Sequence, residues 1–268
     1  MTIIDNPALS IVIPTFNEAE VLAESIALLG RHVDLMAIEL VLVDDGSSDA
    51  TATIAAEIVA GLPRARLVLL PVNRGKGAAL RAGIAVTSGD AVLFMDADMS
   101  TSLDVIDIVI GKLATADVVI GSRAISGSVV ERSSVLRVTM GRTFNSMMRS
   151  VTGLDVHDSQ CGFKAFRGTV ARDLFRLSTC DRFAIDPEVL CLAKVLGYLV
   201  LEHPVEWVAG RKSSVRPVRD SVLTALDLFA VSWATRPAGV QRRIEQTGVD
   251  VGSPVVASLE PGIEPLAT

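Results

Sequence analysis

Short apolar runs that alternate with helical segments dominate the first half of this chain. Each run is followed by a polar break and then by apolar positions at helical spacing, such as Val21, Leu22, Ile26 and Leu29. The predicted strands are residues 9–13, 38–43, 66–70, 91–95 and 117–121. Strands that alternate with helices in this way predict an α/β fold with a mostly parallel, doubly wound sheet and helices on both faces.

Polar side chains gather directly after most of the predicted strands. In a parallel sheet the carboxyl ends of the strands meet at one rim, and ligands bind there. A single cluster is explained by a strand end or a helix N-cap, but several on one rim favour a ligand site. The clusters are Thr15–Glu18, Asp44–Asp49, Arg74–Lys76, Asp96 with Asp98, and Ser122 with Arg123.

The stretch 91–100 is a buried strand that ends in Asp96-Ala97-Asp98. Because side chains alternate along a strand, both carboxylates project to the same side where the chain leaves the sheet. They repel each other unless a cation or hydrogen-bond donors compensate. Mg²⁺ or Mn²⁺ bound to a substrate phosphate would compensate them, and two solvated acids at a strand end are the simpler alternative.

Two further clusters have the chemistry of a nucleotide site. Asp44 and Asp45 can accept hydrogen bonds from a base or from ribose hydroxyls, although a helix N-cap would need only one of them. In segment 73–77 the glycines permit close approach of a ligand and Lys76 offers a charge to a phosphate, with a solvated loop as the alternative. The sequence has neither GxGxxG after the first strand nor GxxxxGK[ST], which disfavours dinucleotide oxidoreductases and P-loop nucleotidases.

The totals narrow the class of protein. A chain of 268 residues with a net charge of -6 and a pI near 5.2 is not typical of a general nucleic-acid binder, so no nucleic-acid partner is expected. Three cysteines without metal-site spacing fit a reduced, cytoplasmic protein. The sequence has no signal-peptide pattern and no apolar run long enough to span a bilayer. We therefore expect a cytoplasmic protein, with any membrane contact peripheral and on the cytoplasmic face.

The second half of the chain is richer in arginine. Arginines outnumber acids over 123–149, which predicts an anionic partner, and a helix is expected over 134–151. Residues 211–236 are predicted to form a basic, amphipathic segment, helical over 218–233, that lies on an anionic membrane or packs on the protein. An edge strand interrupted by Pro204 is expected over 199–207, and 237–268 is predicted to be a disordered tail.

Asp186 and Glu188 admit two interpretations. Asp186 is a natural N-cap, with Pro187 at the first helical position and Glu188 in the first turn of a helix over 189–196. Alternatively, one of these carboxylates stands beside the acceptor of a reaction.

With these residues in hand, the sequence resembles the family 2 glycosyltransferases of the GT-A fold. Segments 158–166 and 183–190 are most similar to the dolichyl- or polyprenyl-phosphate β-glucosyltransferases, followed by the mannosyl-phosphate dolichol synthases. The resemblance implies a GT-A catalytic domain over 1–210, with a donor half over 9–123 and an acceptor half over 124–210. The matching motifs, in family order, are IVIPTFNE at 11–18, VDDGSSDAT at 43–51, NRGKGAALRAG at 73–83, MDADMS at 95–100, GSR at 121–123 and QCGFKAF at 160–166.

The resemblance also implies roles for individual residues. Asp96 and Asp98 would be the DXD pair, with Asp98 the more direct ligand of Mg²⁺ or Mn²⁺, and Ser100 stands where the family often has a glutamine. Base and ribose would be held by Pro14, Thr15, Glu18, Asp44 and Asp45, with Lys76 and Asp96 beside the nucleotide. The acceptor phosphate would be bound by Arg123 with Arg132 or Arg137, and the sugar or diphosphate region would be lined by Gln160 and Lys164.

The implied activity is an inverting transfer of a hexose from a nucleotide-diphosphate sugar to a polyprenyl or dolichyl phosphate. UDP-glucose is favoured as the donor over GDP-mannose. A family 2 enzyme with a soluble hydroxyl acceptor is the alternative, and in it Asp186 or Glu188 would act as the catalytic general base. A nucleotide-sugar-binding protein without turnover is a third interpretation, which the DXD pair disfavours.

Overall fold

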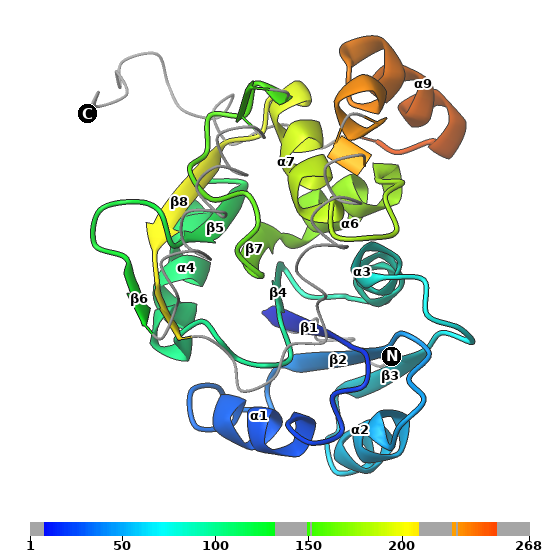
Figure 1. The fold of residues 1–268 in the computed structure, drawn as a ribbon, viewed down its shortest axis with the longest axis vertical. Helices are drawn as coiled ribbons and strands as arrows, with labels where there is room; N and C mark the ends of the chain where they lie inside the picture. Colours follow the sequence, from blue (N-terminus) through cyan, green and yellow to red (C-terminus); the bar gives the residue numbers. More distant parts are fainter. Residues whose placement is uncertain (1–7, 132–148, 151, 209–226, 229, 251–268) are drawn as a thin grey trace, which may run out of the picture.

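The computed structural model describes residues 8–131, 149–150, 152–208, 227–228 and 230–250. These residues build a seven-stranded sheet with the order β3-β2-β1-β4-β7-β5-β8 (Figure 1). Its strands are β1 (Leu9–Thr15), β2 (Glu39–Asp44), β3 (Ala65–Leu69), β4 (Ala91–Met95), β5 (Val118–Ser122), β7 (Phe163–Arg167) and β8 (Val200–Pro204). The predicted α/β class with a mostly parallel sheet is confirmed.

β7 runs antiparallel to both of its neighbours, β4 and β5. Because of this reversal the start of β7 lies beside the end of β4, where Phe163 is opposite Met95. The loop that precedes β7 therefore reaches the rim at which β1, β2 and β4 end.

β1 extends two residues beyond its predicted end. The predicted strand over 9–13 stops before Pro14, but Pro14 pairs in register with Val43 of β2, and Thr15 pairs with Asp44. On its other side β1 pairs with β4 only as far as Val12. Pro14 thus lies where one side of the ladder has already ended, which is a position that tolerates a residue without an N–H group.

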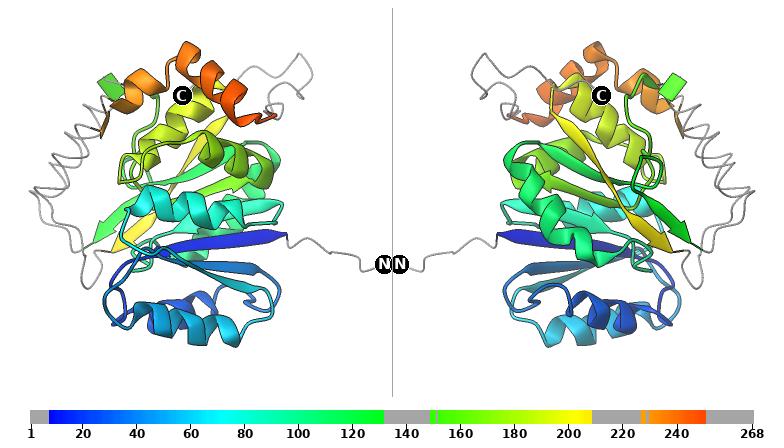
Figure 2. Two further views of the ribbon diagram at one scale, coloured as in Figure 1. Left: turned by 90° about the vertical axis from the view of Figure 1, so that its right-hand side faces the viewer. Right: turned by 90° about the vertical axis from the view of Figure 1, so that its left-hand side faces the viewer.

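Helices cover both faces of the sheet, as predicted. On one face Ile11 and Ile13 pack against α1 (Leu22–Leu29), α2 (Thr51–Ala60) and α4 (Ile106–Gly111). On the other face Val12 packs in a core with α3 (Lys76–Ala85), α6 (Gly168–Leu177) and α7 (Ile185–Val195). Figure 2 shows the molecule from the two opposite sides. Because side chains alternate along β1, this strand contributes residues to two hydrophobic cores, one on each face of the sheet.

A second, two-stranded sheet adjoins the rim. It pairs β6 (Val129–Glu131) with β9 (Glu206–Val208) in parallel. The predicted strand over 199–207 is divided at Pro204: β8 forms the edge of the main sheet and β9 belongs to this second sheet. Trp207 of β9 also forms an isolated antiparallel bridge with Thr101.

The chain beyond residue 236 differs from our prediction. Residues 237–247, expected within a disordered tail, form the helix α9 (Pro237–Thr247), with Pro237 in its first turn and Gly248 in the left-handed conformation that ends it. Val240 of α9 is buried in the core that includes α6 and α7. Our prediction missed this helix because a short helix that is buried on only one side produces no long apolar run in the sequence.

Several predictions fall on residues outside the described ranges. The predicted helix over 134–151 and the tail over 251–268 lie largely or wholly outside them, as do residues 211–226 of the basic segment. Within the described part of the chain, no helix has the length and apolarity needed to cross a membrane.

Candidate active site

The carboxyl ends of β1, β2 and β4 bring the predicted donor residues to one rim. Thr15 and Asp44 are directly opposite each other in the ladder. Thr15 is buried, and its hydroxyl donates to the carbonyl of Val43 at 3.1 Å. Pro14, next to Thr15, is half-buried. Both residues therefore form part of the wall of the rim. The hydroxyl proton of Thr15 is not available to a ligand, because it is donated to Val43.

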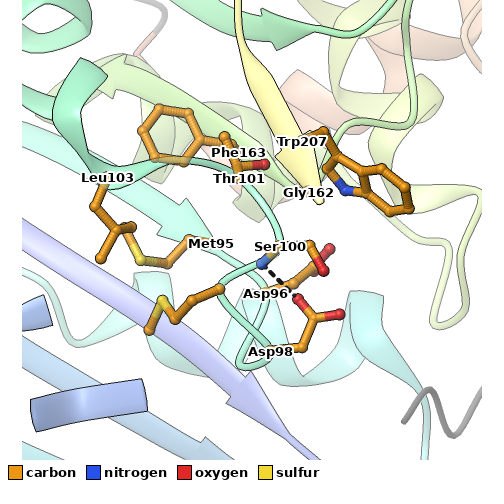
Figure 3. Close-up of a pocket in the computed structure, with 10 residues that line it drawn as sticks. Met95, Asp96, Asp98, Ser100, Thr101, Leu103, Gly162, Phe163 and Trp207 are labelled. Carbon is orange, nitrogen blue, oxygen red and sulfur yellow. Dashed lines mark hydrogen bonds between the residues drawn. The ribbon is translucent and has the colours of Figure 1, made fainter. Parts of the chain in front are cut away.

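Asp96 and Asp98 lie in the turn directly after β4. The Asp96 amide donates to the carbonyl of Gly162 at 3.0 Å, and Asp98 accepts from the Ser100 amide at 3.0 Å. A Cβ atom on Gly162 would overlap the Asp96 carboxylate, so a larger residue there would displace that carboxylate. These residues line one hollow (Figure 3).

Burial and neighbouring acids dominate the surroundings of Glu18 and of Asp98. Burial, followed by the charges of Asp98, Asp49 and Asp96, raises the pKa of Glu18 to about 7. Burial and then the charge of Asp96 raise the pKa of Asp98. Carboxylates whose ionised forms are disfavoured in this way gain stability when a cation arrives.

These residues fit a divalent cation that is shared with a substrate. Among the described residues, no group of three or more His, Cys, Asp or Glu side chains is arranged to hold a metal ion by itself. Mg²⁺ commonly binds through one or two carboxylates and completes its shell with substrate phosphates and water. Asp96 and Asp98 match that kind of site.

Asp44 and Asp45 are adjacent in sequence but differ in their bonding. The Oδ2 atom of Asp44 accepts from the Ser47 amide, and its Oδ1 atom is buried with no hydrogen-bond partner among the described residues. Asp45 accepts from the Asn73 side chain and from the amides of Arg74 and Gly75. Asp44 thus has an oxygen to offer to a ligand, whereas Asp45 holds the loop that precedes α3.

Lys76, the first residue of α3, joins the acidic turn to α7. Its Nζ atom lies 2.9 Å from Asp96 and 3.2 Å from Asp186. The glycines on either side, which we expected to face a ligand, instead face the loop before α7: a Cβ on Gly75 would lie 2.6 Å from the carbonyl oxygen of Asp181. The glycines therefore let that loop pack on the first turn of α3.

Asp186 is buried between two lysines. Lys164 of β7, which is fully buried, donates to Asp186 at 2.5 Å and to the Cys161 carbonyl at 2.5 Å. Burial acts to raise the pKa of Asp186, but the charges of Lys164 and Lys76 outweigh it and hold that pKa below its ordinary value. The helix begins at Ile185 with Ala184 as its N-cap, so Asp186 is not the cap that we predicted.

Glu188 lies away from the hollow. It is fully buried and accepts hydrogen bonds from the amides of Thr179 and Cys180. Arg243 of α9 contacts it at 2.9 Å. The structure therefore does not bring Glu188 together with Asp96 and Asp98, and it gives this predicted base a structural set of partners.

Arg123, at the end of β5, is fixed by Asp158. Its Nε and Nη2 atoms donate to the two Asp158 carboxylate oxygens at 2.7 and 2.9 Å. Burial acts to raise the pKa of Asp158, but Arg123 outweighs burial and lowers it. The backbone N–H of Gln160 also donates to Asp158 at 3.3 Å. Arg132 and Arg137 lie outside the described residues.

Trp207 is a residue of the hollow that our sequence analysis missed. It lines the hollow together with Asp96 and Asp98 and stacks near Arg123, whose Cζ atom lies 5.6 Å from the ring centroid. The available signal was a tryptophan just after the break at Pro204, in a chain that has only two.

Comparison with known proteins identifies the family. The model of Glycosyl transferase family 2 matches residues 10–175. A dolichyl-phosphate beta-glucosyltransferase of Dictyostelium discoideum is 31% identical to this chain, and the alignment covers 86% of this chain and 75% of that protein. A dolichyl-phosphate beta-glucosyltransferase of Trichomonas vaginalis is 34% identical to this chain, and the alignment covers 82% of this chain and 69% of that protein.

Solved structures agree with this assignment. Glucosyl-3-phosphoglycerate synthase from Mycobacterium tuberculosis, in complex with Mn²⁺, UDP and glucosyl-3-phosphoglycerate, matches with a TM-score of 0.62 and 25% identity. The match covers 84% of this chain and 80% of that protein. The chain therefore belongs to glycosyl transferase family 2 and is a glycosyltransferase with the GT-A fold.

Proposed function

We propose that this enzyme transfers a hexose, preferably glucose, from a UDP-sugar donor to a polyprenyl or dolichyl phosphate with inversion at the anomeric carbon. The observation that carries the proposal is the hollow itself, which has the acidic turn of Asp96 and Asp98 on one side and Trp207, stacked near Arg123, on the other. The dolichyl-phosphate relatives support the lipid acceptor, and the neighbour bound to Mn²⁺ and UDP supports the donor.

We assign donor binding to the rim. The unpartnered Oδ1 of Asp44 would accept from the base or the ribose, with Pro14, Thr15 and Glu18 forming the adjoining wall. Asp45 would act by holding the loop that carries Lys76 beside the nucleotide. A Mg²⁺ or Mn²⁺ ion on Asp98 and Asp96 would neutralise charge on the leaving diphosphate.

We assign acceptor binding to the opposite side. A phosphate monoester is already anionic near neutral pH, so its attack requires relief of charge repulsion more than removal of a proton. Arg123, held in place by Asp158, would supply that relief, with Arg132 or Arg137. Lys164 would act through Asp186, and Gln160 would line the sugar region. Attack on the face opposite the leaving group inverts the anomeric carbon.

A soluble hydroxyl acceptor is the second candidate, and the similarity to glucosyl-3-phosphoglycerate synthase favours it. Such an acceptor needs a general base. Asp186 is paired with two lysines and Glu188 with Arg243, so neither carboxylate is available as a base without breaking a buried ion pair. This makes the lipid phosphate the better-supported acceptor.

The test is transfer from UDP-glucose and, separately, from GDP-mannose to a polyprenyl phosphate in mixed micelles with Mn²⁺ or Mg²⁺. We expect a lipid-linked product with UDP-glucose, and we expect its loss in EDTA and in the Asp98→Ala variant. Metal-dependent binding of UDP-glucose without a lipid product would refute the lipid acceptor and move the search to soluble acceptors.

We further propose that the enzyme works at the cytoplasmic face of the membrane through peripheral contact, because its acceptor is a membrane lipid. The basic segment 211–236 is the proposed contact. Flotation with anionic vesicles tests this, and failure to float at low ionic strength would contradict it.

A further inference from the structure

Trp207 is anchored to the chain that follows the acidic turn. The Val208 amide donates to the Ser100 carbonyl at 2.8 Å, and the Ser102 amide donates to the Glu206 carbonyl at 2.9 Å. These bonds flank the bridge between Trp207 and Thr101. Backbone bonds on both sides therefore fix the position of Trp207 relative to the acidic turn.

Trp207 is also held against the acceptor side. The guanidinium of Arg123 lies over its ring at 5.6 Å, and Asp158 fixes that guanidinium through two hydrogen bonds. Glu202 of β8 fixes Asp158 in turn by accepting from its amide at 3.1 Å. The indole is therefore supported from the donor side and from the acceptor side.

The transferred group must pass between these two sides. It is bonded to the diphosphate that leaves from the acidic turn, and it is attacked by the phosphate that binds at Arg123. Trp207 borders the hollow that Asp96 and Asp98 line (Figure 3).

We infer that Trp207 packs against the transferred hexose and determines which sugar the enzyme accepts. The inference deepens the proposed function and rests on it for the identity of the donor. A glucopyranose ring carries its hydroxyls equatorially and so presents C–H groups on both faces, which suit the broad apolar face of an indole. An axial hydroxyl, as in galactose, places a polar group on one face.

The experiment compares binding of UDP-glucose with binding of UDP, by calorimetry in the presence of Mn²⁺. We expect Trp207→Ala to raise the Kd for UDP-glucose about tenfold and to change the Kd for UDP by less than about twofold. Trp207→Phe, which keeps an aromatic face, should raise the Kd for UDP-glucose by about threefold or less. The wild type should also bind UDP-glucose more tightly than UDP-galactose, and Trp207→Ala should narrow that difference.

Trp233 provides a matched control because it is the other tryptophan in the chain and is 68% exposed. Trp233→Ala should leave the ratio of the two Kd values unchanged. Equal weakening of UDP and UDP-glucose in both Trp207 variants would overturn the inference, because it would mean that Trp207 only supports the acidic turn. Unchanged donor binding with a raised KM for the lipid phosphate would overturn it as well, because Trp207 would then act through Arg123.

Failure of the proposed function gives a different result. If the wild type makes no lipid product but Trp207→Ala still selectively loses affinity for UDP-glucose, the acceptor assignment fails and the role of Trp207 stands.

Discussion

Glu18 and Asp98 in the donor half have surroundings opposite to those of Asp158 and Asp186 in the acceptor half. Burial and neighbouring acids raise the pKa of Glu18 and of Asp98, which lie at the ends of β1 and β4. In the acceptor half, cations outweigh burial and lower the pKa of Asp158 and of Asp186. Both groups are at least partly buried, so the difference lies in the charge that the fold supplies.

This comparison separates two uses of a carboxylate. An acid that the fold has already paired holds the structure together, as Asp158 holds Arg123 and Glu188 holds the loop before α7. An acid that the fold leaves short of positive charge has capacity for a ligand. On this basis we propose that the donor half binds a cation with its substrate and that the acceptor half orients cations towards an anion.

The largest effect should come from removing the acid that we assign as the more direct ligand of the metal ion. Asp98→Ala should reduce transfer to the lipid phosphate by about 10³-fold, because charge on the leaving diphosphate is no longer neutralised. The measurement is the initial rate at saturating Mn²⁺, with circular dichroism to confirm folding. A rate within tenfold of the wild type would break the comparison on the donor side.

A paired acid should show its effect in stability. Asp186→Asn leaves the buried amine of Lys164 without its counter-charge, and we expect the free energy of unfolding to fall by about 3 kcal/mol. Urea unfolding monitored by fluorescence measures this. An unchanged free energy of unfolding would mean that Asp186 is not a structural acid and would restore it as a candidate base.

A glycine pair tests the geometry of the acidic turn. Gly162→Ala places a methyl group where the Asp96 carboxylate lies, and we expect transfer to fall by about 10²-fold with the metal dependence weakened. Gly111→Ala in α4 is the matched control, because a Cβ there meets nothing within 4 Å. If both variants behave alike, the position of Asp96 does not control the reaction.

The smallest effect should appear in the pH dependence of stability. The folded-state pKa of Glu18, about 7, exceeds its ordinary value of 4.5, so between these values the folded protein binds more protons than the unfolded chain. The contribution of Glu18 to stability therefore falls as the pH rises through this window. Glu18→Gln should gain about 1 kcal/mol over the wild type at pH 8 compared with pH 4.5, a small value because Glu18 keeps contact with water. A constant difference across pH would show that Glu18 is not under electrostatic strain.

The sequence predicted which residues lie at the rim of the sheet, but it did not predict how the charged residues pair. Apolar runs ended by polar clusters predicted the strands and placed Asp44 and Asp96 at one edge, because both features are local. The partners of Asp186 and Glu188 lie far away in sequence, at Lys76, Lys164 and Arg243. Periodicity carries no information about such contacts.

The direction of β7 was also beyond reach of the sequence pattern. Residues 163–167 read as a strand in either direction, and only the fold shows that β7 runs against β4 and so brings Gly162 to Asp96. Trp207 was missed for a similar reason, since its partners Thr101 and Arg123 come from other elements.

The most direct test of the central claim is Mn²⁺ binding in the presence of UDP, followed by electron paramagnetic resonance. We predict that the wild type binds one Mn²⁺ ion in the hollow and that Asp98→Asn loses it. Asp181 lies in the acceptor half and is paired with Arg74 and Arg81. The Asp181→Asn variant, which neutralises this acid, should retain the Mn²⁺ ion. Equal Mn²⁺ binding by Asp98→Asn and the wild type would contradict the claim that Asp98 is left short of positive charge and so binds a cation.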